Sequence, residues 1–184
     1  MSYHIFAGRF QPFHVGHLDV LEKGIADLGD DDVLVVAVVT AFKGVIIDTS
    51  FAKTAAEHHA PDRNPWGPLV SLRAVSQLAR KMGASEQIIT TILPAPDTCW
   101  LEITKWFPSD RKWIIPDSKE QFDDVKAEFF QKCGESVLRY KDSSSVSGRE
   151  LRGYYLNSDY ENFKMHIPEM IVDIYWNGGL YRSL

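Results

Sequence analysis

The sequence predicts an α/β fold: a Rossmann-like, doubly wound parallel sheet of five strands, with helices on both faces and a helical segment at its C-terminal end. Short apolar runs alternate along the chain with stretches in which apolar residues recur every three or four positions. The run "VLVVAVV" at 33–39 is β-branched without alternation, which is typical of a parallel strand buried on both faces. Strands separated by helices require right-handed crossovers, and these produce a parallel sheet.

Five short apolar segments are predicted as strands. The first, "YHIFAG", ends on a glycine and leads directly into a helical pattern. In parallel sheets of this kind ligands bind at the carboxyl ends of the strands, near the point where the strand order reverses. The predicted strands are residues 3–8, 33–39, 87–93, 111–116 and 135–140.

Helices are expected between these strands. The first has Leu18, Leu21, Ile25 and Leu28 at spacings of three and four, which indicates one face turned toward the core. Between the second strand and the second helix the sequence is irregular, of mixed polarity and interrupted by glycines and prolines, so a long loop is expected at 44–66. The other predicted helices cover residues 69–83, 97–107, 118–134 and the surroundings of 167–176.

Length and charge limit the function classes. The 184 residues predict a single domain, divided into a core at 1–145 and a phosphate-binding motif with C-terminal helices at 146–184. Twenty basic and 25 acidic residues give a net charge of -5, so no nucleic-acid partner is expected and any anion site must be local. Two cysteines, no secretory features and no apolar run long enough for a bilayer predict a cytoplasmic protein without a membrane partner.

The stretch "GRFQPFHVGHL" begins at Gly8, where the first strand passes into the first helix. Backbone N–H groups at a helix start are unpaired and partly positive, so an anion is stabilised there. Gly8 allows a sharp turn, and Gly16 removes a side chain between His14 and His17. Arg9 adds a planar fork suited to phosphate. The sequence shows no third ligand that would make the histidines a zinc site, so the pattern indicates a polyphosphate site.

This stretch resembles the HxGH signature of nucleotidylyltransferases and, more narrowly, the first motif of archaeal-type nicotinamide mononucleotide adenylyltransferases. The resemblance implies that His14 and His17 bind the nucleotide's phosphates and stabilise the transition state. It also implies that Arg9 contacts phosphate groups. We expect Gly8, Phe10 and Gly16 to belong to the same nucleotide-phosphate site.

A second motif, "VSGRELR" at 146–152, resembles the ISGTEIR motif with which this family closes its site. The resemblance implies that Ser147 and Arg152 hold the β- and γ-phosphates, with Arg152 counted among the catalytic residues. Gly148 can present its N–H at a helix start. Arg149 stands where the family has threonine, which indicates either a more anionic ligand or a solvent-facing substitution.

Three further segments resemble the acceptor-binding parts of the family. "VVTAFKG" aligns Thr40 and Lys43 with a family segment, and "NPWGPLVSLR" places Arg73 at the family's acceptor-phosphate arginine. "DTCW" keeps a tryptophan, Trp100, but has Asp97 in place of asparagine. A tryptophan can stack on a flat ring, whereas an ionised aspartate only accepts hydrogen bonds. The alternative is that Asp97 caps a helix and Trp100 belongs to the core.

The reaction implied is in-line attack by an acceptor phosphate on the α-phosphorus of a nucleoside triphosphate, with release of pyrophosphate and with Mg²⁺ delivered by the nucleotide. Three functions stay open. The first is an adenylyltransferase that makes NAD from ATP and nicotinamide mononucleotide. The second, favoured by Asp97, Arg149 and the altered "PDSKEQ" segment, is a CTP-dependent cytidylyltransferase for a small phosphate or phosphonate. The third is a nucleotide-binding regulator without turnover. Because relatives form multimers, a homo-oligomer is also open.

Overall fold

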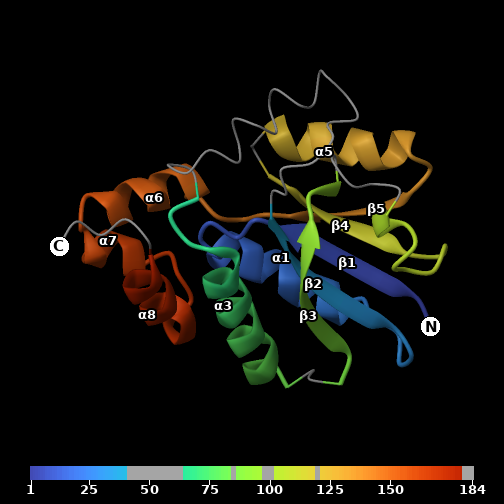
Figure 1. The fold of residues 1–184 in the computed structure, drawn as a ribbon, viewed down its shortest axis with the longest axis horizontal. Coiled ribbons are helices and arrows are strands. Elements are labelled where there is room, and N and C mark those ends of the chain that lie inside the picture. The colour runs from blue at the N-terminus through green and yellow to red at the C-terminus, as the bar shows by residue number, and fades with distance from the viewer. Residues whose placement is uncertain (41–63, 84–85, 97–101, 119–120, 180–184) are drawn as a thin grey trace.

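The computed structural model describes residues 1–40, 64–83, 86–96, 102–118 and 121–179. It contains a five-stranded, all-parallel sheet with the strand order β3-β2-β1-β4-β5 (Figure 1). Each strand lies within one residue of its predicted bounds, and the predicted α/β class is confirmed. The strands are β1 (Tyr3–Gly8), β2 (Val33–Thr40), β3 (Ile88–Pro94), β4 (Lys112–Asp117) and β5 (Ser136–Lys141).

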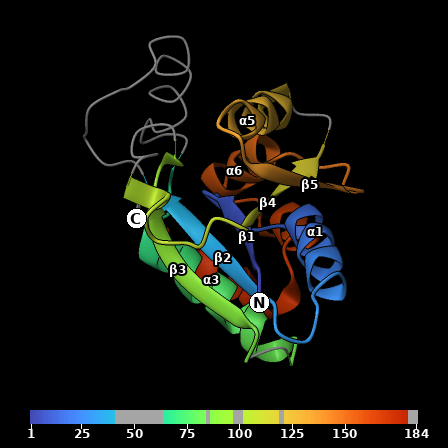
Figure 2. The same ribbon diagram turned by 90° about the vertical axis from the view of Figure 1, so that its right-hand side faces the viewer.

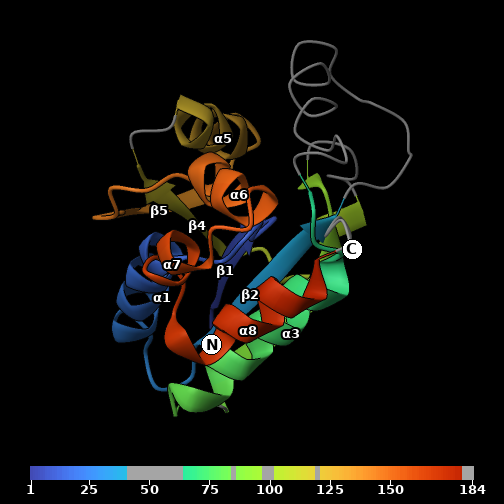
Figure 3. The same ribbon diagram turned by 90° about the vertical axis from the view of Figure 1, so that its left-hand side faces the viewer.

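Helices cover both faces of this sheet (Figures 2 and 3). Helices α1, α3 and α8 pack on one face, and α8 runs alongside α3 (Figure 3). Helix α5 packs on the other face. None of the described helices is long and apolar enough to span a membrane. The helices are α1 (Val15–Ala26), α3 (Pro68–Lys81), α5 (Gln121–Lys132), α6 (Gly148–Leu156), α7 (Tyr160–Lys164) and α8 (Glu169–Gly178).

The two covered faces explain why the central strands β1 and β2 are apolar without alternation. Successive side chains of a strand point to opposite faces. In β1, Phe6 joins the core beneath α1 and α3, whereas Ile5 and Ala7 join the core beneath α5. In β2, Val36 joins the core beneath α1 and α3, and Val35 joins the core beneath α5. Because both faces are covered, both sets of side chains must be apolar.

The buried face of α1 differs slightly from the predicted one. Leu21 is fully buried as predicted, whereas Leu18, Ile25 and Leu28 are partly buried against the same core. Val20 is fully buried as well. The contact is centred on Val20 because Gly24 lets the helix approach β4 closely: a Cβ at Gly24 would lie 2.9 Å from Ile114 Cδ1.

The end of the predicted long loop is anchored in the core. Residues 41–63 lie outside the described part of the chain, but Trp66 is only 1% exposed. Its Nε1 donates to the carbonyl of Tyr175 in α8 at 2.7 Å. The amide side chain of Gln11 donates to the Trp66 carbonyl at 2.7 Å and accepts from the Trp66 N–H at 3.2 Å. The chain before α3 is therefore tied both to α8 and to the turn after β1.

Candidate functional site

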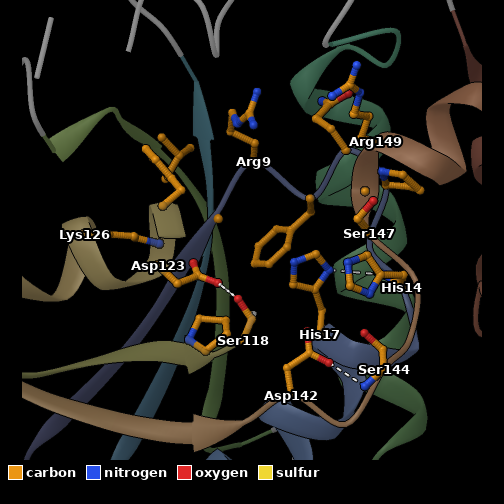
Figure 4. Close-up of a pocket in the computed structure, with 18 of the residues that line it drawn as sticks. Arg9, His14, His17, Ser118, Asp123, Lys126, Asp142, Ser144, Ser147 and Arg149 are labelled. Carbon is orange, nitrogen blue, oxygen red and sulfur yellow. Dashed lines mark hydrogen bonds between the residues drawn. The ribbon is translucent and has the colours of Figure 1, made fainter. Parts of the chain in front are cut away.

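A cavity of about 690 Å³ opens at the carboxyl ends of β1 and β4, the point where the strand order reverses (Figure 4). The turn after β1, the start of α1, helix α5, the segment after β5 and helix α6 all contribute to its walls. His14 and His17 of the first motif line it together with Ser147 and Arg152 of the second. The fold therefore brings the two motifs, which lie at opposite ends of the sequence, to one site.

Two histidines cap the start of α1. Nδ1 of His14, the N-cap residue, accepts a hydrogen bond from the N–H of Gly16 at 3.2 Å. Nδ1 of His17 accepts one from the N–H of His14 at 3.3 Å, and the ring centroids are 3.9 Å apart. Because Nδ1 is the acceptor in both rings, each neutral imidazole carries its proton on Nε2. Each ring therefore has an N–H donor that the cap does not use.

Both imidazoles are neutral at pH 7 in the free protein. Burial lowers the pKa of His14 to about 4. Burial also lowers the pKa of His17 well below its usual value, with smaller contributions from His14 and Lys126. Since neither ring is charged before a ligand binds, the electrostatic attraction for an anion comes first from the helix start and the nearby arginines.

We expect the buried His14 to make the protein less stable in acid. The unfolded chain takes up a proton near pH 6.5 that folded His14 accepts only near pH 4, so the free energy of unfolding falls as the pH drops between these values. The loss is about 3 kcal/mol, the equivalent of the difference between the two pKa values. His14→Asn keeps an N-cap residue but removes the titrating group. Denaturant unfolding of both proteins at several pH values should show a flatter profile for the variant, and parallel profiles would contradict this role of His14.

Gly16 allows the segment after β5 to lie against the start of α1. A Cβ at Gly16 would collide with the carboxylate of Asp142 and with Oγ of Ser144. These two residues are themselves joined, because Asp142 Oδ1 accepts from the Ser144 N–H at 2.8 Å (Figure 4). This segment leads directly to Ser147. Gly16 itself is not among the described residues that line the cavity, and the space beside it is filled by Asp142 and Ser144 rather than open to a ligand. What Gly16 allows is the close approach of the second motif to the first.

Gly16→Ala is expected to destabilise the protein by about 1–3 kcal/mol, the usual effect of overpacking a close contact. Gly153→Ala is the matched control, since Gly153 is also helical and a Cβ there meets nothing within 4 Å. Alanine favours a helix over glycine, so this control should unfold at the same denaturant concentration or a higher one. If both variants unfold at the wild-type midpoint, the close contact at Gly16 is not important for stability.

Ser147 and Glu150 cap the start of α6 through each other's side chains. Ser147 Oγ accepts from the Glu150 N–H at 3.3 Å, and the Glu150 carboxylate accepts from the Ser147 N–H and O–H at 2.8 and 2.9 Å. A phosphate that binds Ser147 must therefore compete with Glu150. Arg152 Nη1 donates to the Gln11 carbonyl at 2.9 Å, and Gly148 packs beside it, with a Cβ position 3.3 Å from Arg152 Nη1. Helix α6 is thus joined to the turn after β1.

The remaining residues predicted for the nucleotide phosphates also line the cavity. Phe10 is buried and has a φ of 50°, the left-handed region. Gly8 packs against its ring, since a Cβ at Gly8 would lie 2.7 Å from Phe10 Cε1. Arg9 is partly exposed, and its Nη1 lies 3.4 Å from Asn64 Oδ1. Arg149 is exposed at the start of α6.

The described structure does not bring the residues predicted for the acceptor into the cavity lining. Lys43, Asp97 and Trp100 lie outside the described residues. The carbonyl of Thr40, at the end of β2, accepts from the Ala95 N–H at 3.1 Å, and Arg73 is exposed on α3. Among the described residues that line the cavity, neither Thr40 nor Arg73 is present. Their roles stay predictions.

Sequence reasoning missed the polar wall that α5 contributes. Lys126 and Asp123 line the cavity together with Ser118, on the side away from His14 and Ser147 (Figure 4). Lys126 Nζ donates to the Ala7 carbonyl at the end of β1, and Ser118 Oγ donates to Asp123 Oδ2. Charged residues of an amphipathic helix are normally solvated, so their positions in the sequence carry no signal of a cavity. In the described part of the chain no group of three or more His, Cys, Asp or Glu is arranged to hold a metal ion.

Comparison with known proteins supports the assignment of the fold. Residues 5–43, which contain β1, α1 and β2, match the family model described as cytidylyltransferase-like. No curated protein matches the chain in sequence.

Three solved structures resemble this one. A bifunctional NMN adenylyltransferase/ADP ribose pyrophosphatase from Francisella tularensis is 14% identical, with a TM-score of 0.56 over 85% of this chain and 42% of its own. A protein from Vibrio parahaemolyticus, assigned as a nicotinate-nucleotide adenylyltransferase, is 14% identical, with a TM-score of 0.55 over 95% of this chain and 97% of its own.

The nicotinic acid mononucleotide adenylyltransferase of Plasmodium falciparum, complexed with NaAD, is 12% identical, with a TM-score of 0.53 over 98% of this chain and 99% of its own. The chain thus spans less than half the length of the Francisella protein and nearly the whole length of the other two. At these identities the similarity establishes the Rossmann-like fold.

Proposed function

We propose that the protein is a nucleotidylyltransferase, which transfers a nucleoside monophosphate from a nucleoside triphosphate to a small phosphate-bearing acceptor and releases pyrophosphate. One observation carries the proposal. The starts of two helices, α1 with His14 and His17 and α6 with Ser147 and Arg152, line a single cavity at the reversal of the strand order. Two helix starts that share a cavity suit a chain of several phosphates.

In this mechanism the protein positions the triphosphate and offsets its charge. Ser147 and Arg152 bind the outer phosphates, which become the leaving pyrophosphate. The unused imidazole N–H groups of His14 and His17 donate toward the α-phosphate, where negative charge grows in the transition state. An acceptor phosphate is already an anion at neutral pH, so the chemistry needs no general base.

Mg²⁺ is proposed to arrive with the nucleotide. The described residues offer no three-ligand metal site, whereas a triphosphate supplies several oxygen ligands of its own. The bound ion would offset phosphate charge during the transfer.

ATP and nicotinamide mononucleotide are the substrates we propose first. The structures that this chain resembles, as reported above, bear the names of NMN and nicotinic acid mononucleotide adenylyltransferases. The second candidate is a CTP-dependent transfer to a small phosphate or phosphonate. The extra cation Arg149 at the cavity favours it. The match of residues 5–43 to the cytidylyltransferase-like model is compatible with both candidates.

Pyrophosphate release tests both candidates. The protein is assayed with ATP, CTP, GTP and UTP, each combined with nicotinamide mononucleotide, nicotinic acid mononucleotide, phosphocholine, glycerol 3-phosphate and 2-aminoethylphosphonate. Turnover with ATP and either pyridine mononucleotide supports the first candidate, and a preference for CTP replaces it with the second. If no pair reacts although nucleotides bind, the protein is not a transferase for these substrate classes and the regulator is favoured.

A further inference from the structure

The cavity has a second cationic wall, across from the starts of α1 and α6. Helix α5 places Lys126 beside the end of β1, where its ammonium group donates to the carbonyl of Ala7. Arg9 follows two residues after Ala7 and also lines the cavity. Figure 4 shows Lys126 across the cavity from His14 and Ser147, with Arg9 nearer the middle. An anion bound at this wall would be separate from the two helix starts.

Among the described residues, no acidic side chain forms an ion pair with Lys126, whose ammonium group donates to a backbone carbonyl. Its hydrogen-bond partner, the carbonyl of Ala7, is neutral. The carboxylate of Asp123 raises the pKa of Lys126 through its charge, but it accepts its hydrogen bond from Ser118. Burial, and to a lesser extent Arg9, lowers the pKa of Lys126. A partly buried ammonium with a second cation nearby is stabilised when an anion enters.

The direction of the reaction suggests which anion this is. In-line transfer places the attacking and leaving oxygens on opposite sides of the α-phosphorus. If the pyrophosphate leaves toward Ser147 and Arg152 of α6, the acceptor must approach from the opposite side of the cavity. That side is formed by α5 and the end of β1, where Lys126 and Arg9 lie. The charge of Lys126 also reaches His17, whose pKa it helps to lower, so the two residues flank one space.

We propose that Lys126, together with Arg9, binds the phosphate or phosphonate group of the acceptor and holds it for attack. This inference rests on the proposed transferase function. It assigns the acceptor's anionic group to a helix for which the sequence predicted no binding role, and it gives Arg9, which the sequence predicted for the nucleotide phosphates, a role at the acceptor instead. Thr40 and Arg73, the described residues predicted for the acceptor, are not among the residues that line the cavity.

Lys126→Gln tests the proposal, because glutamine can still donate to the Ala7 carbonyl but carries no charge. Lys132→Gln is the matched control on the same helix, since Lys132 is exposed and pairs with Glu128. For the reacting pair found in the pyrophosphate assay, Lys126→Gln should raise the acceptor KM about 10- to 100-fold, the usual effect of losing a hydrogen bond to a charged group. The triphosphate KM should change less than about twofold, as should both KM values of Lys132→Gln.

A binding measurement separates this proposal from the transferase proposal. The triphosphate site is first filled with the α,β-methylene analogue of ATP and Mg²⁺, and inorganic phosphate is then titrated by calorimetry. We expect wild type and Lys132→Gln to bind phosphate and Lys126→Gln to bind it at least about tenfold more weakly, while Lys126→Arg restores part of the affinity. This pattern supports the anion site at Lys126 even if no substrate pair reacts, in which case only the transferase proposal fails.

Two results would overturn the role of Lys126. The first is an acceptor KM and a phosphate affinity in Lys126→Gln equal to those of wild type. The second is an equal loss for both substrates together with a lower unfolding temperature, which would make Lys126 a structural residue that holds the end of β1.

Discussion

Replacing His17 by alanine is expected to lower the rate of pyrophosphate release by a factor of about 10² to 10³, while the protein still folds. The reason is the loss of a donor aimed at the α-phosphate, where charge develops during the transfer; removal of one such donor typically costs about 3–4 kcal/mol of transition-state stabilisation. The alanine variant also loses the hydrogen bond from the His14 N–H at the start of α1. The assay is steady-state pyrophosphate release with the substrate pair found in the panel.

His17→Gln separates the imidazole from the helix cap. Glutamine is an ordinary residue at the third helical position of a capping box, so it can accept from the His14 N–H but has no imidazole. Equal losses of activity in both variants assign the effect to the imidazole. Recovery of activity in His17→Gln would assign it to the cap. His166→Gln is a further control, because His166 stacks on Tyr154 and is not among the described residues that line the cavity. Near-normal turnover in pure His17→Ala would remove His17 from the mechanism.

Arg152→Ala should reduce kcat/KM for the triphosphate by about 10²-fold, the second largest effect expected. Two losses combine here. The guanidinium no longer offsets the charge of the outer phosphates, and its hydrogen bond to the Gln11 carbonyl is broken. Gln11 in turn binds the backbone of Trp66 through both the nitrogen and the oxygen of its side-chain amide. The variant therefore weakens phosphate binding and loosens the turn that connects α6 with the chain before α3.

Two companion variants make the Arg152 result interpretable. Arg152→Lys keeps the positive charge but not the planar fork, so it should recover only part of the activity. Arg149→Ala removes an exposed cation from the same helix, and solvent screening should limit its effect to less than about tenfold. If Arg149→Ala proves more damaging than Arg152→Ala, the outer phosphates lie nearer the rim of the cavity than we propose.

Local sequence signals predicted the central strands accurately because a strand buried on both faces must be apolar throughout. The segment 33–39 is the clearest case, and β2 occupies Val33–Thr40. The two helix starts were equally visible, since His14 and Ser147 are both N-cap residues within recognisable motifs. Both kinds of signal depend on residues that are neighbours along the chain.

Contacts between segments that lie far apart in the sequence could not be predicted from local sequence patterns. Trp66 was placed in a loop, yet its indole reaches Tyr175 and its backbone pairs with Gln11. Lys126 belongs to a helix whose period predicts only which side packs on the sheet, not that the neighbouring side borders a cavity. The sequence predicted that the missing side chain of Gly16 makes room for a ligand. In the structure the side chains of Asp142 and Ser144 occupy that room.

The sequence by itself determined the order of the five strands and the helix starts at His14 and Ser147, because these follow from hydrophobic periodicity and helix capping over a few residues. The phosphate-binding role of the two motifs stays a prediction. The family resemblance implied that the two motifs serve one site, and the tertiary structure places both in one cavity. Only the tertiary structure showed that Lys126 forms the opposite wall of that cavity. The physical reason is that the parallel sheet brings the ends of β1 and β4 together, and with them helices whose residues lie far apart in the sequence.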